Sequence, residues 1–543
     1  MSRFVDTMVA TAASADERGM TTGEPAAPTR RTWAEVHEVA RRVAGALVAD
    51  GLAPGSSVAV LAGEPASIAP TVQGVWLAGG SITMLHQPTA RTDLAEWARD
   101  TLRVLEMIDA RVVLLGTPFD ALADVLDSNG VAYRKIAELA GSPLASPVPV
   151  DESATALLQL TSGSTAEPKA VRITHGNLWS NAKAMETAAR LDPEHDRMVS
   201  WLPLFHDMGM VGFLTVPMLF GIDLVKVTPV DFLARPTLWP DLISRYRGTI
   251  TAAPNFAYAI AARRMEGVED GTWDLSTLRI ALNGAEPIDP EAVRSFTNAG
   301  ARFGMPAECV LCAYGMAETT LGVAFAPAFT GLAVDVVDAD ELEAGRRAVA
   351  SSAPGARAFP LLGPPLPGLE VQVVDESGTV RGEREVGQLR VRGEAVTPEY
   401  LTVDGPVATQ DAEGWLDTGD EGYLVGGQVV VCGRRKDVII MGGRNIYPTD
   451  IERAATSVEG VRAGNAVAVR LDAGTRRERF AVVVESRLAG DGDAERELTK
   501  QISARVVDAV GLRPYAVVVL KPGSLPKTPS GKLRRSAAAG LVP

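Results

Sequence analysis

The sequence has few cysteines and no excess of basic residues, and each shortage excludes a class of protein. Three cysteines in 543 residues cannot build a disulfide framework, so we expect a protein of the reducing cytoplasm. Lys and Arg number 53 against 67 Asp and Glu, which gives a formal net charge of -14. Nucleic-acid-binding domains usually carry a basic face, so we expect no nucleic-acid partner.

Signals for export, membrane insertion and zinc binding are also missing. Residues 1–20 are polar and lack the basic-then-apolar layout of a signal peptide. The most apolar later stretch, 212–227, contains Pro217 and Asp223, so we interpret it as core and expect no transmembrane segment. Cys309 and Cys312 form a C-x-x-C without a second pair, which favours buried structural thiols over a zinc site. Peripheral attachment to a membrane stays open.

What the sequence does contain is an alternation of strand and helix patterns that continues for about 320 residues. The chain of 543 residues is too long to fold around one hydrophobic core, so two or more domains are expected. Thr32 and Glu35 form a capping-box pattern ahead of a helix that Gly51 ends. Such alternation predicts crossover units and mostly parallel sheets, with ligands bound beyond the carboxyl ends of the strands. The expected strands are 58–61, 112–115, 198–202, 224–227, 249–252, 278–282 and 309–313, with a helix at 68–77.

From about residue 369 the pattern changes to short strands without helices between them. Strands are expected at 370–374, 386–391 and 428–431, followed by a charged corner at 433–437. The remainder has a helix near Ile451, strands at 466–471, 480–485 and 515–520, and a helix at 495–510, enough for an independent domain. The fold class is therefore α/β. A large domain, 1–433, holds two mostly parallel sheets and a β-rich subdomain, and a small α+β domain, 434–543, follows it.

One loop gathers more polar groups than any other part of the chain. Between two apolar runs, residues 161–169 offer four hydroxyls and one ammonium group to a small volume. Consecutive backbone N–H groups in a turn hold anions, so we predict a polyphosphate site. The pattern is not a P-loop, because Pro168 precedes Lys169 and Ala170 follows it. A plain surface turn is the alternative, since Ser, Thr and Gly are turn formers.

Five motifs together resemble the adenylate-forming ligases. They are the loop 161–169, Tyr-Gly-Met-Ala-Glu at 314–318, Thr-Gly-Asp at 418–420, Gly-Arg at 433–434, and Pro-Lys-Thr-Pro-Ser-Gly-Lys at 526–532. Their order and spacing match the family over roughly residues 30–535, although each motif alone is weak. The resemblance implies ATP-dependent activation of a carboxylate, which gives an acyl-adenylate and pyrophosphate. Such a reaction needs positioned cations and hydrogen-bond donors more than a covalent nucleophile.

The resemblance assigns most site residues. It makes Lys532 the residue that bridges the substrate carboxylate and the α-phosphate, although the segment 527–535 could also be a basic frayed tail. Lys169 and His206 complete the catalytic group. Glu318 would hold Mg²⁺, with Thr161 as a second contact, unless it is only a helix-start glutamate. The nucleotide-binding residues would be Thr161, Ser162, Gly163, Ser164, Thr165, Gly284, Ala285, Glu286, Tyr314, Gly315, Met316, Asp420 and Arg434.

Two of these motifs have simpler interpretations. Tyr314 alone would more often be a core residue, and Thr-Gly-Asp at 418–420 alone is only a turn.

Lys436 stands where the family has the hinge between its large and small domains, although it could be an ordinary loop lysine. Ala166 and Ala170 occupy positions where the family usually has glycine, so we expect a stiffer phosphate loop.

The motif Phe-His-Asp-Met-Gly at 205–209 bears on the substrate. Amino-acid-activating relatives have an aspartate directly after the phenylalanine, where this chain has His206, so a substrate without an amine is expected. Asp207 would weaken this argument if it pointed into the pocket, and we expect it to be structural. The small apolar residues nearby suit a fatty chain.

The same motif resembles the fatty acyl-AMP ligase branch, which carries an inserted segment that we place at about 332–360. In that branch the insertion is associated with poor use of coenzyme A, and the acyl group passes to an acyl carrier protein or a polyketide-synthase carrier domain. An ordinary surface loop is the alternative interpretation of the segment. We therefore expect a cytoplasmic enzyme that uses ATP and Mg²⁺ to activate a fatty acid. The alternatives are a fatty acyl-CoA synthetase of the same fold and a non-catalytic acyl or nucleotide sensor.

Overall fold

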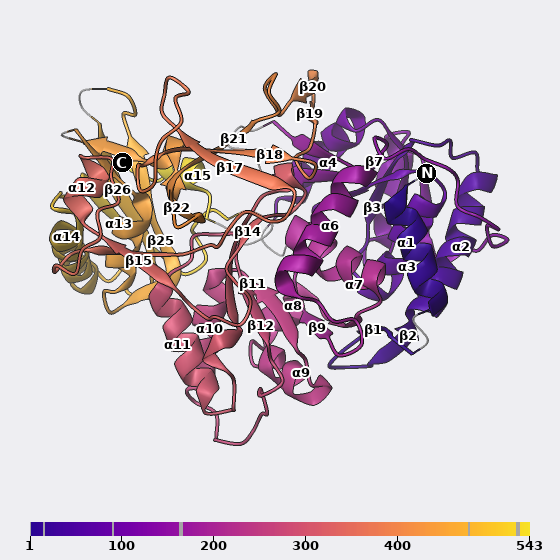
Figure 1. The fold of residues 1–543 in the computed structure, drawn as a ribbon, viewed down its shortest axis with the longest axis horizontal. Helices are drawn as coiled ribbons and strands as arrows, with labels where there is room; N and C mark the ends of the chain where they lie inside the picture. Colours follow the sequence, from indigo (N-terminus) through magenta and orange to yellow (C-terminus); the bar gives the residue numbers. More distant parts are fainter. Residues whose placement is uncertain are drawn as a thin grey trace.

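The computed structural model describes residues 2–14, 17–88, 92–161, 167–441, 443–475, 478–527 and 533–543. Figure 1 shows the N-terminal part of the chain on the right, the middle part below, and the C-terminal part on the left. Two eight-stranded sheets, one four-stranded sheet and a three-stranded sheet account for most of the strands.

The first of the two large sheets, here called sheet A, forms the floor of the later site. Its order is β14-β13-β12-β11-β9-β10-β1-β2, and all pairs are parallel except those made by the edge strands β14 and β2. The bounds are β1 (Gly19–Thr22), β2 (Thr29–Thr32), β9 (Arg197–Ser200), β10 (Asp223–Lys226), β11 (Ile250–Ala253), β12 (Ile280–Asn283), β13 (Val310–Gly315) and β14 (Gly322–Phe325).

The other large sheet, sheet B, carries the predicted phosphate loop. Its order is β20-β19-β8-β7-β4-β3-β5-β6, with a parallel half from β7 to β6 and an antiparallel half from β20 to β7. Thr161 pairs with Lys169 where β7 and β8 separate, so these two strands are antiparallel partners at the ends of the predicted phosphate loop. The bounds are β3 (Ser57–Leu61), β4 (Ser81–Met84), β5 (Ala110–Leu115), β6 (Tyr133–Lys135), β7 (Thr155–Thr161), β8 (Lys169–Thr174), β19 (Glu399–Thr402) and β20 (Gly405–Ala408).

Helices cover both large sheets, as expected for crossover connections. The capping box predicted at Thr32 is present, because Thr32 accepts from Glu35 N and the Glu35 carboxylate accepts from Thr32 N. The helices of this part are α1 (Arg3–Ser14), α2 (Trp33–Ala49), α3 (Pro65–Leu77), α4 (Leu94–Met107), α5 (Ala123–Ser128), α6 (His175–Ala189), α7 (Val216–Phe220), α8 (Pro229–Ala234), α9 (Leu238–Tyr246), α10 (Asn255–Met265) and α11 (Pro290–Ala301).

The predicted insertion folds as a small unit of its own. Strands β15 (Val334–Val337) and β16 (Arg357–Pro360) pair antiparallel, with α12 (Ala339–Glu343) between them. Glu343 is fully buried and ion-pairs with Arg357 of β16 and Arg444, and Arg357 also pairs with Asp450. The segment 332–360 therefore lies against the C-terminal part of the chain.

The β-rich subdomain and the C-terminal part contain the expected strands and helices, together with elements that the sequence did not predict, such as β21. An antiparallel sheet of order β17-β18-β21-β22 comes first, then the three-stranded sheet β25-β26-β27 with α13 and α14 packed against it. The bounds are β17 (Leu369–Val374), β18 (Gly387–Gly393), β21 (Leu416–Val425), β22 (Gln428–Arg434), β23 (Ile439–Met441), β24 (Arg444–Ile446), α13 (Pro448–Thr456), β25 (Val461–Leu471), β26 (Arg479–Ser486), α14 (Gly492–Val510), β27 (Ala516–Leu520) and α15 (Arg535–Ala539). The domain boundary at 433/434 stays a prediction.

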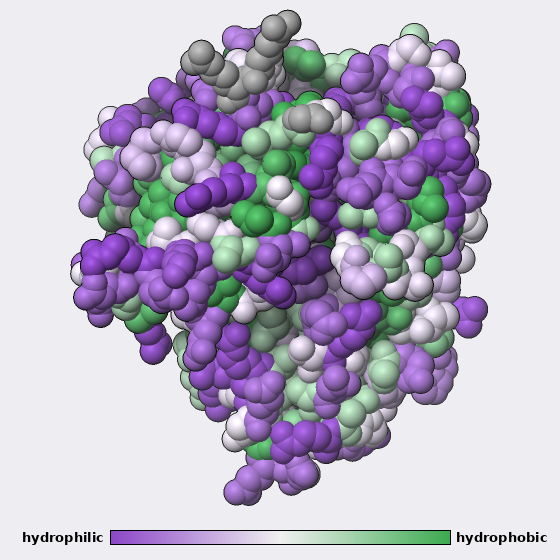
Figure 2. Space-filling model, turned by 90° about the vertical axis from the view of Figure 1, so that its left-hand side faces the viewer, coloured by the Kyte–Doolittle hydropathy of each residue, from purple (hydrophilic) through white to green (hydrophobic). Residues whose placement is uncertain are grey.

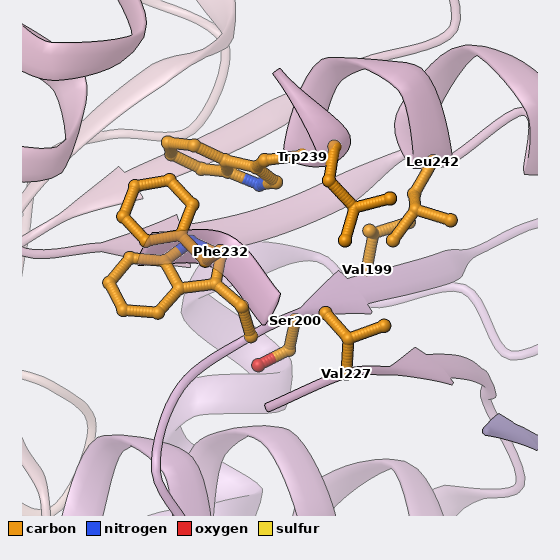
Figure 3. A pocket seen from close by; sticks show the side chains of 8 residues that line it. Val199, Ser200, Val227, Phe232, Trp239 and Leu242 are labelled. Atoms are coloured by element: carbon orange, nitrogen blue, oxygen red, sulfur yellow. The ribbon is translucent and has the colours of Figure 1, made fainter. Parts of the chain in front are cut away.

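The face of sheet A away from the site is closed by aromatic side chains. Figure 3 shows Val199, Phe232, Trp239 and Leu242 around one apolar void, and the ring of Trp201 stacks on Phe232 at 4.1 Å. This packing leaves no space there for a ligand-sized molecule.

Among the described residues, no helix is both long enough and apolar enough to span a membrane. The stretch 212–227 is instead mostly buried core, as predicted. Figure 2, which views the molecule from the side of the C-terminal part, shows a surface dominated by hydrophilic residues with smaller apolar areas.

Candidate active site

A cavity of about 890 Å³ lies where sheet A, sheet B, the β-rich subdomain and the C-terminal part meet. Its walls include the carboxyl ends of β7, β12 and β13, which is where open α/β sheets bind ligands. One end is polar and the other is apolar. The predicted site residues that line it are Thr161, Lys169, His206, Gly284, Ala285, Tyr314, Gly315, Met316, Glu318, Arg434 and Lys436.

At the polar end, Tyr400 connects the two charged groups that the sequence singled out. Its hydroxyl donates to Glu318 Oε1 at 2.7 Å, and the Lys169 ammonium lies 3.9 Å from the centre of its ring. Burial and the Glu318 carboxylate both raise the pKa of Tyr400, so its proton stays on the oxygen. Burial lowers the pKa of Lys169.

The hydroxyl of Thr161 has no partner among the described residues. Its Oγ1 is buried and makes no hydrogen bond with the part of the chain that the structure describes. Buried hydroxyls normally find a partner, so this oxygen is one that a ligand in the cavity would satisfy. Thr161 Oγ1 lies at the start of the predicted phosphate loop.

Behind the polar end, three predicted nucleotide-binding residues form one chain of contacts. The Tyr314 hydroxyl donates to Asp420 Oδ2 at 2.6 Å, and Arg434 Nε lies 3.0 Å from Asp420 Oδ1. Burial raises the pKa of Asp420 even though Arg434 opposes this. Asp420 does not line the cavity itself, and it orients the Tyr314 ring and the Arg434 guanidinium, which do.

The segment Gly284-Ala285-Glu286 is brought to the cavity only in part. Gly284 and Ala285 line the wall, and Ala285 has a φ of 67°, a left-handed conformation uncommon for alanine. The Glu286 carboxylate instead accepts the backbone N–H of Phe256 at 2.6 Å, which fixes the start of α10.

His206 and Asp207 both line the cavity, and they pair with each other. His206 Nδ1 lies 2.6 Å from Asp207 Oδ1, and the same oxygen accepts the backbone N–H of Met208. Asp207 thus has the structural role that we expect, since its carboxylate caps the following helical turn. It also borders the cavity, which was not expected from the sequence. His86 packs edge-on against Phe205, and burial with the neighbouring His206 lowers its pKa to about 4.

The C-terminal part contributes a cationic wall. Arg434, Arg435, Lys436, Arg470, Arg534 and Arg535 all line the cavity. Arg470 Nη1 donates to the Lys436 carbonyl at 3.3 Å. Carboxylates balance much of this charge. The pairs are Arg434 with Asp420, Arg435 with Asp417, Arg470 with Glu478 and Arg535 with Glu452.

Several predicted residues lie outside the described part of the chain. These are Ser162, Gly163, Ser164 and Thr165 of the loop, and Lys532 near the C-terminus. Their roles stay predictions.

Sequence reasoning missed Tyr400 and His86. Tyr400 is in a hairpin, β19–β20, that leaves the β-rich subdomain and pairs with β8 of sheet B. In the sequence, Tyr400 is a single tyrosine between the strands expected at 386–391 and 428–431, and nothing near it indicates this long-range pairing. His86 follows β4, and its position after a strand end was the one available signal.

Comparison with known proteins places this geometry in a family. The AMP-binding enzyme family matches residues 11–401, well over half of the chain. The chain belongs to the AMP-binding enzyme family. Enzymes of this family use ATP, and the chain is an AMP-forming acid ligase of the adenylate-forming group.

Three relatives differ in what their names say about the acceptor. Rv1013 of Mycobacterium tuberculosis, provisionally named a ligase, is 55% identical over 544 residues, the full length of both chains. A Caulobacter vibrioides protein provisionally named an acyl-CoA synthetase is 33% identical, covering 93% of this chain and 89% of its own. JamA of Moorena producens, a medium-chain-fatty-acid–[acyl-carrier-protein] ligase, is 34% identical over 72% of this chain and 68% of its own.

A solved structure agrees with the branch as well as the fold. A chain from a study of fatty acyl-adenylate ligases of E. coli and L. pneumophila superposes with a TM-score of 0.89. It is 29% identical, and the match covers 100% of this AMP-binding enzyme and 97% of that chain. The predicted fold class and the predicted fatty acyl-AMP ligase branch are both confirmed.

Proposed function

We propose that the enzyme activates a fatty acid to its acyl-adenylate and passes the acyl group to a carrier protein. The observation that supports this most is the division of one cavity into a polar end with Lys169, Glu318 and Tyr314 and an apolar end lined by sheet A and α6. ATP fits the first end and an unbranched acyl chain the second. A cavity that joins the two would bring the carboxylate next to the α-phosphate.

The reaction we propose has two bond-forming steps. In the first, adenylation, a carboxylate oxygen of the fatty acid attacks the α-phosphorus of ATP, the bond to the β-phosphate oxygen breaks, and pyrophosphate leaves. In the second, the carrier thiol attacks the acyl carbon, the thioester bond forms and AMP leaves. Negative charge spreads over the phosphate oxygens in the transition state of the first step, so positioned cations lower the barrier. Lys169, Arg434 and, by resemblance, Lys532 are the cations we assign to this role.

The residues present are compatible with Mg²⁺. Within the described ranges no cluster of three or more His, Cys, Asp or Glu could hold a metal alone. Mg²⁺ commonly takes one or two protein oxygens and completes its shell with phosphate oxygens and water. Glu318 would supply the carboxylate, and Thr161 has the unpartnered oxygen; when bound, the ion would neutralise phosphate charge.

Coenzyme A is the second candidate acceptor, because one relative is named an acyl-CoA synthetase. The carrier-protein acceptor is favoured by the name of JamA and by the folded insertion at 332–360. Both acceptors present a phosphopantetheine thiol, so the chemistry of transfer is the same.

The test supplies purified enzyme with decanoic acid, Mg·ATP and either coenzyme A or a phosphopantetheinylated carrier protein. We expect AMP and pyrophosphate in both cases and thioester mainly on the carrier. Efficient formation of acyl-CoA would contradict the carrier-protein proposal and show that coenzyme A is the acceptor.

Lys532→Ala tests the residue assignment, with Lys521→Ala as a matched control. Lys521 is an exposed lysine of the same C-terminal part and does not line the cavity. Loss of a transition-state contact lowers the rate about 10²–10³-fold. Near-normal adenylation by Lys532→Ala would refute the role of Lys532.

A further inference from the structure

The apolar end of the cavity runs along one face of sheet A. Ile250 of β11 is in register with Met198 of β9 on one side and Ile280 of β12 on the other, so these three side chains share a face. All three are buried, and all three line the cavity. We call Met198, Ile250 and Ile280 the floor row.

Helix α6 forms the opposite wall. Asn181, Met185 and Ala189 recur every four residues and therefore lie on one face of the helix. Asn181 is anchored to β14 by two hydrogen bonds of 2.9 Å with the backbone of Gly322. Met185 and Ala189 line the cavity, so an acyl chain would pass between this helix and the sheet.

A buried ion pair stands directly before the floor row in sequence and joins the start of these strands to the end of α6. Arg279 Nε and Nη2 each lie 2.6 Å from the two carboxylate oxygens of Asp196, whose side chain is fully buried. Thr249 Oγ1 donates to the same carboxylate at 2.7 Å, and Arg279 also donates to the Arg190 carbonyl at the end of α6. Breaking a buried pair is strongly unfavourable, so an alkyl chain does not displace it.

We infer that the acyl channel is closed at this end and accepts medium-length fatty acids with an optimum near ten carbons. Ile280, on the floor row, starts β12, and Gly284, at the polar end, directly follows that strand, so the four residue steps between them span about 13 Å at roughly 3.3 Å per residue. An extended alkyl chain with bonds of ~1.5 Å advances about 1.25 Å per carbon, so about ten carbons fit. This inference rests on the proposed fatty-acid function.

The first test measures adenylation of straight-chain acids from four to eighteen carbons by the unaltered enzyme. Each buried methylene contributes enough for roughly a fourfold gain in kcat/KM, so activity should climb steeply to about ten carbons and then fall. If hexadecanoic acid is used as well as decanoic acid, the channel is open and the inference is wrong. If no acid of any length is adenylated, the proposed function itself fails.

The second test changes the two walls of the channel, the floor row and the face of α6. Ile250→Ala lowers the floor row and should shift the optimum about two carbons longer, with the tetradecanoic to decanoic ratio rising at least tenfold. Ala189→Leu narrows the channel from the helix side and should shift the optimum shorter, which keeps the test available if Ile250→Ala folds poorly.

Val199→Ala is the matched control for the floor variant. Val199 follows Met198 on β9 but points to the opposite face, into the aromatic void of Figure 3. It should cost comparable packing yet leave the chain-length profile unchanged. An Ile250→Ala profile no different from that of Val199→Ala would overturn the inference.

Discussion

Three side chains at the polar end of the cavity come from three separate segments of the chain and from two sheets. Lys169 starts β8 of sheet B, Glu318 follows β13 of sheet A, and Tyr400 belongs to the hairpin that crosses from the β-rich subdomain. Thr397 N, just before that hairpin, also donates to the Glu318 carbonyl at 2.8 Å. Glu318 is therefore held by backbone and side chain together, which fixes the carboxylate proposed to face the metal.

We predict that Tyr400→Phe weakens the binding of Mg·ATP without changing the KM for the fatty acid. The variant keeps the ring beside Lys169 but loses the hydrogen bond to Glu318. A hydrogen bond to a charged group contributes about 1.5–3 kcal/mol, so binding of a non-hydrolysable Mg·ATP analogue, measured by calorimetry, should weaken about tenfold or more.

Tyr423→Phe is the control for this change. Tyr423 is also a buried tyrosine whose hydroxyl donates to a carboxylate, Asp335 at 2.7 Å, but it does not line the cavity. Equal effects of the two variants on nucleotide binding would show that Tyr400 acts only through general stability.

Lys226 supports the loop that carries His206. Its ammonium is fully buried and donates to the backbone carbonyls of Leu202 and Val227. Burial lowers the pKa of Lys226 to about 7, well below its unfolded value near 10.5. Below pH 7 the amine is charged in both states, and its burial costs stability.

We predict that the unaltered enzyme gains stability relative to Lys226→Met between about pH 7 and 10. In that window the folded state has lost the proton and the unfolded state still binds it, so stability rises with pH. Denaturant unfolding of both proteins at pH 6.5, 8 and 9.5 measures the difference. Lys500→Met, a change at an exposed lysine of α14, should show no such trend, and a flat difference for Lys226→Met would contradict the prediction.

The location of the candidate site was easier to predict from the sequence than the contacts that its side chains make. Four of the five motifs contribute residues that line the cavity, because each follows a strand or turn with a distinctive local pattern, whereas residues 528–532 of the fifth lie outside the described chain. The motifs could not reveal that Asp420 stands behind Tyr314 or that Glu286 turns to α10, since these contacts depend on tertiary packing. Ala170 lies in regular β8 opposite Leu160, so it needs no glycine-like backbone, whereas Ala166 is outside the described residues.

At the scale of elements, the fold was largely readable from local patterns. Alternating apolar runs and helix caps predicted most strands of sheet A within one or two residues, because parallel strands are buried and strongly apolar. The elements not predicted include the β19–β20 hairpin, strand β1, the edge strand β2, the long strand β21 and helix α1. Two of them pair with segments distant in sequence, β1 with β10 and β19 with β8.

The insertion is the element whose role is most open to experiment. Glu343 of α12 is held between Arg357 of β16 and Arg444 of β24, and Asn445 donates to its carbonyl at 3.1 Å. These contacts join the insertion to the start of the C-terminal part. A buried carboxylate with two arginines is costly to neutralise, because the cations lose their partner.

We predict that Glu343→Gln destabilises the contact between the insertion and the C-terminal part by about 3 kcal/mol. The readouts are the first unfolding transition in denaturant and the rate of limited proteolysis between residues 434 and 450. Glu341→Gln changes an exposed glutamate of the same helix and should be neutral. Indistinguishable behaviour of the two variants would show that the buried pairs do not hold the segment in place.

At the scale of the molecule, the cavity exists only because four parts of the chain meet. Sheet A supplies the acyl wall, sheet B supplies Lys169 and Tyr400, the β-rich subdomain supplies Thr418, and the C-terminal part supplies arginines. Lys436, which we propose as the hinge, lies in the short turn Arg435–Asp437 between β22 and β23. A rotation there would separate the cationic wall from the rest, in keeping with a second conformation for thioester transfer.

The central claim is that a fatty carboxylate attacks the α-phosphorus of ATP. The direct measurement uses decanoic acid labelled with ¹⁸O in its carboxyl group, with Mg·ATP and a thiol acceptor, and follows the label by mass spectrometry. The account predicts decanoyl-AMP before acceptor is added and one ¹⁸O atom in the AMP released after transfer. Label in inorganic phosphate with release of ADP, or no adenylate with any acid from four to eighteen carbons, would contradict it.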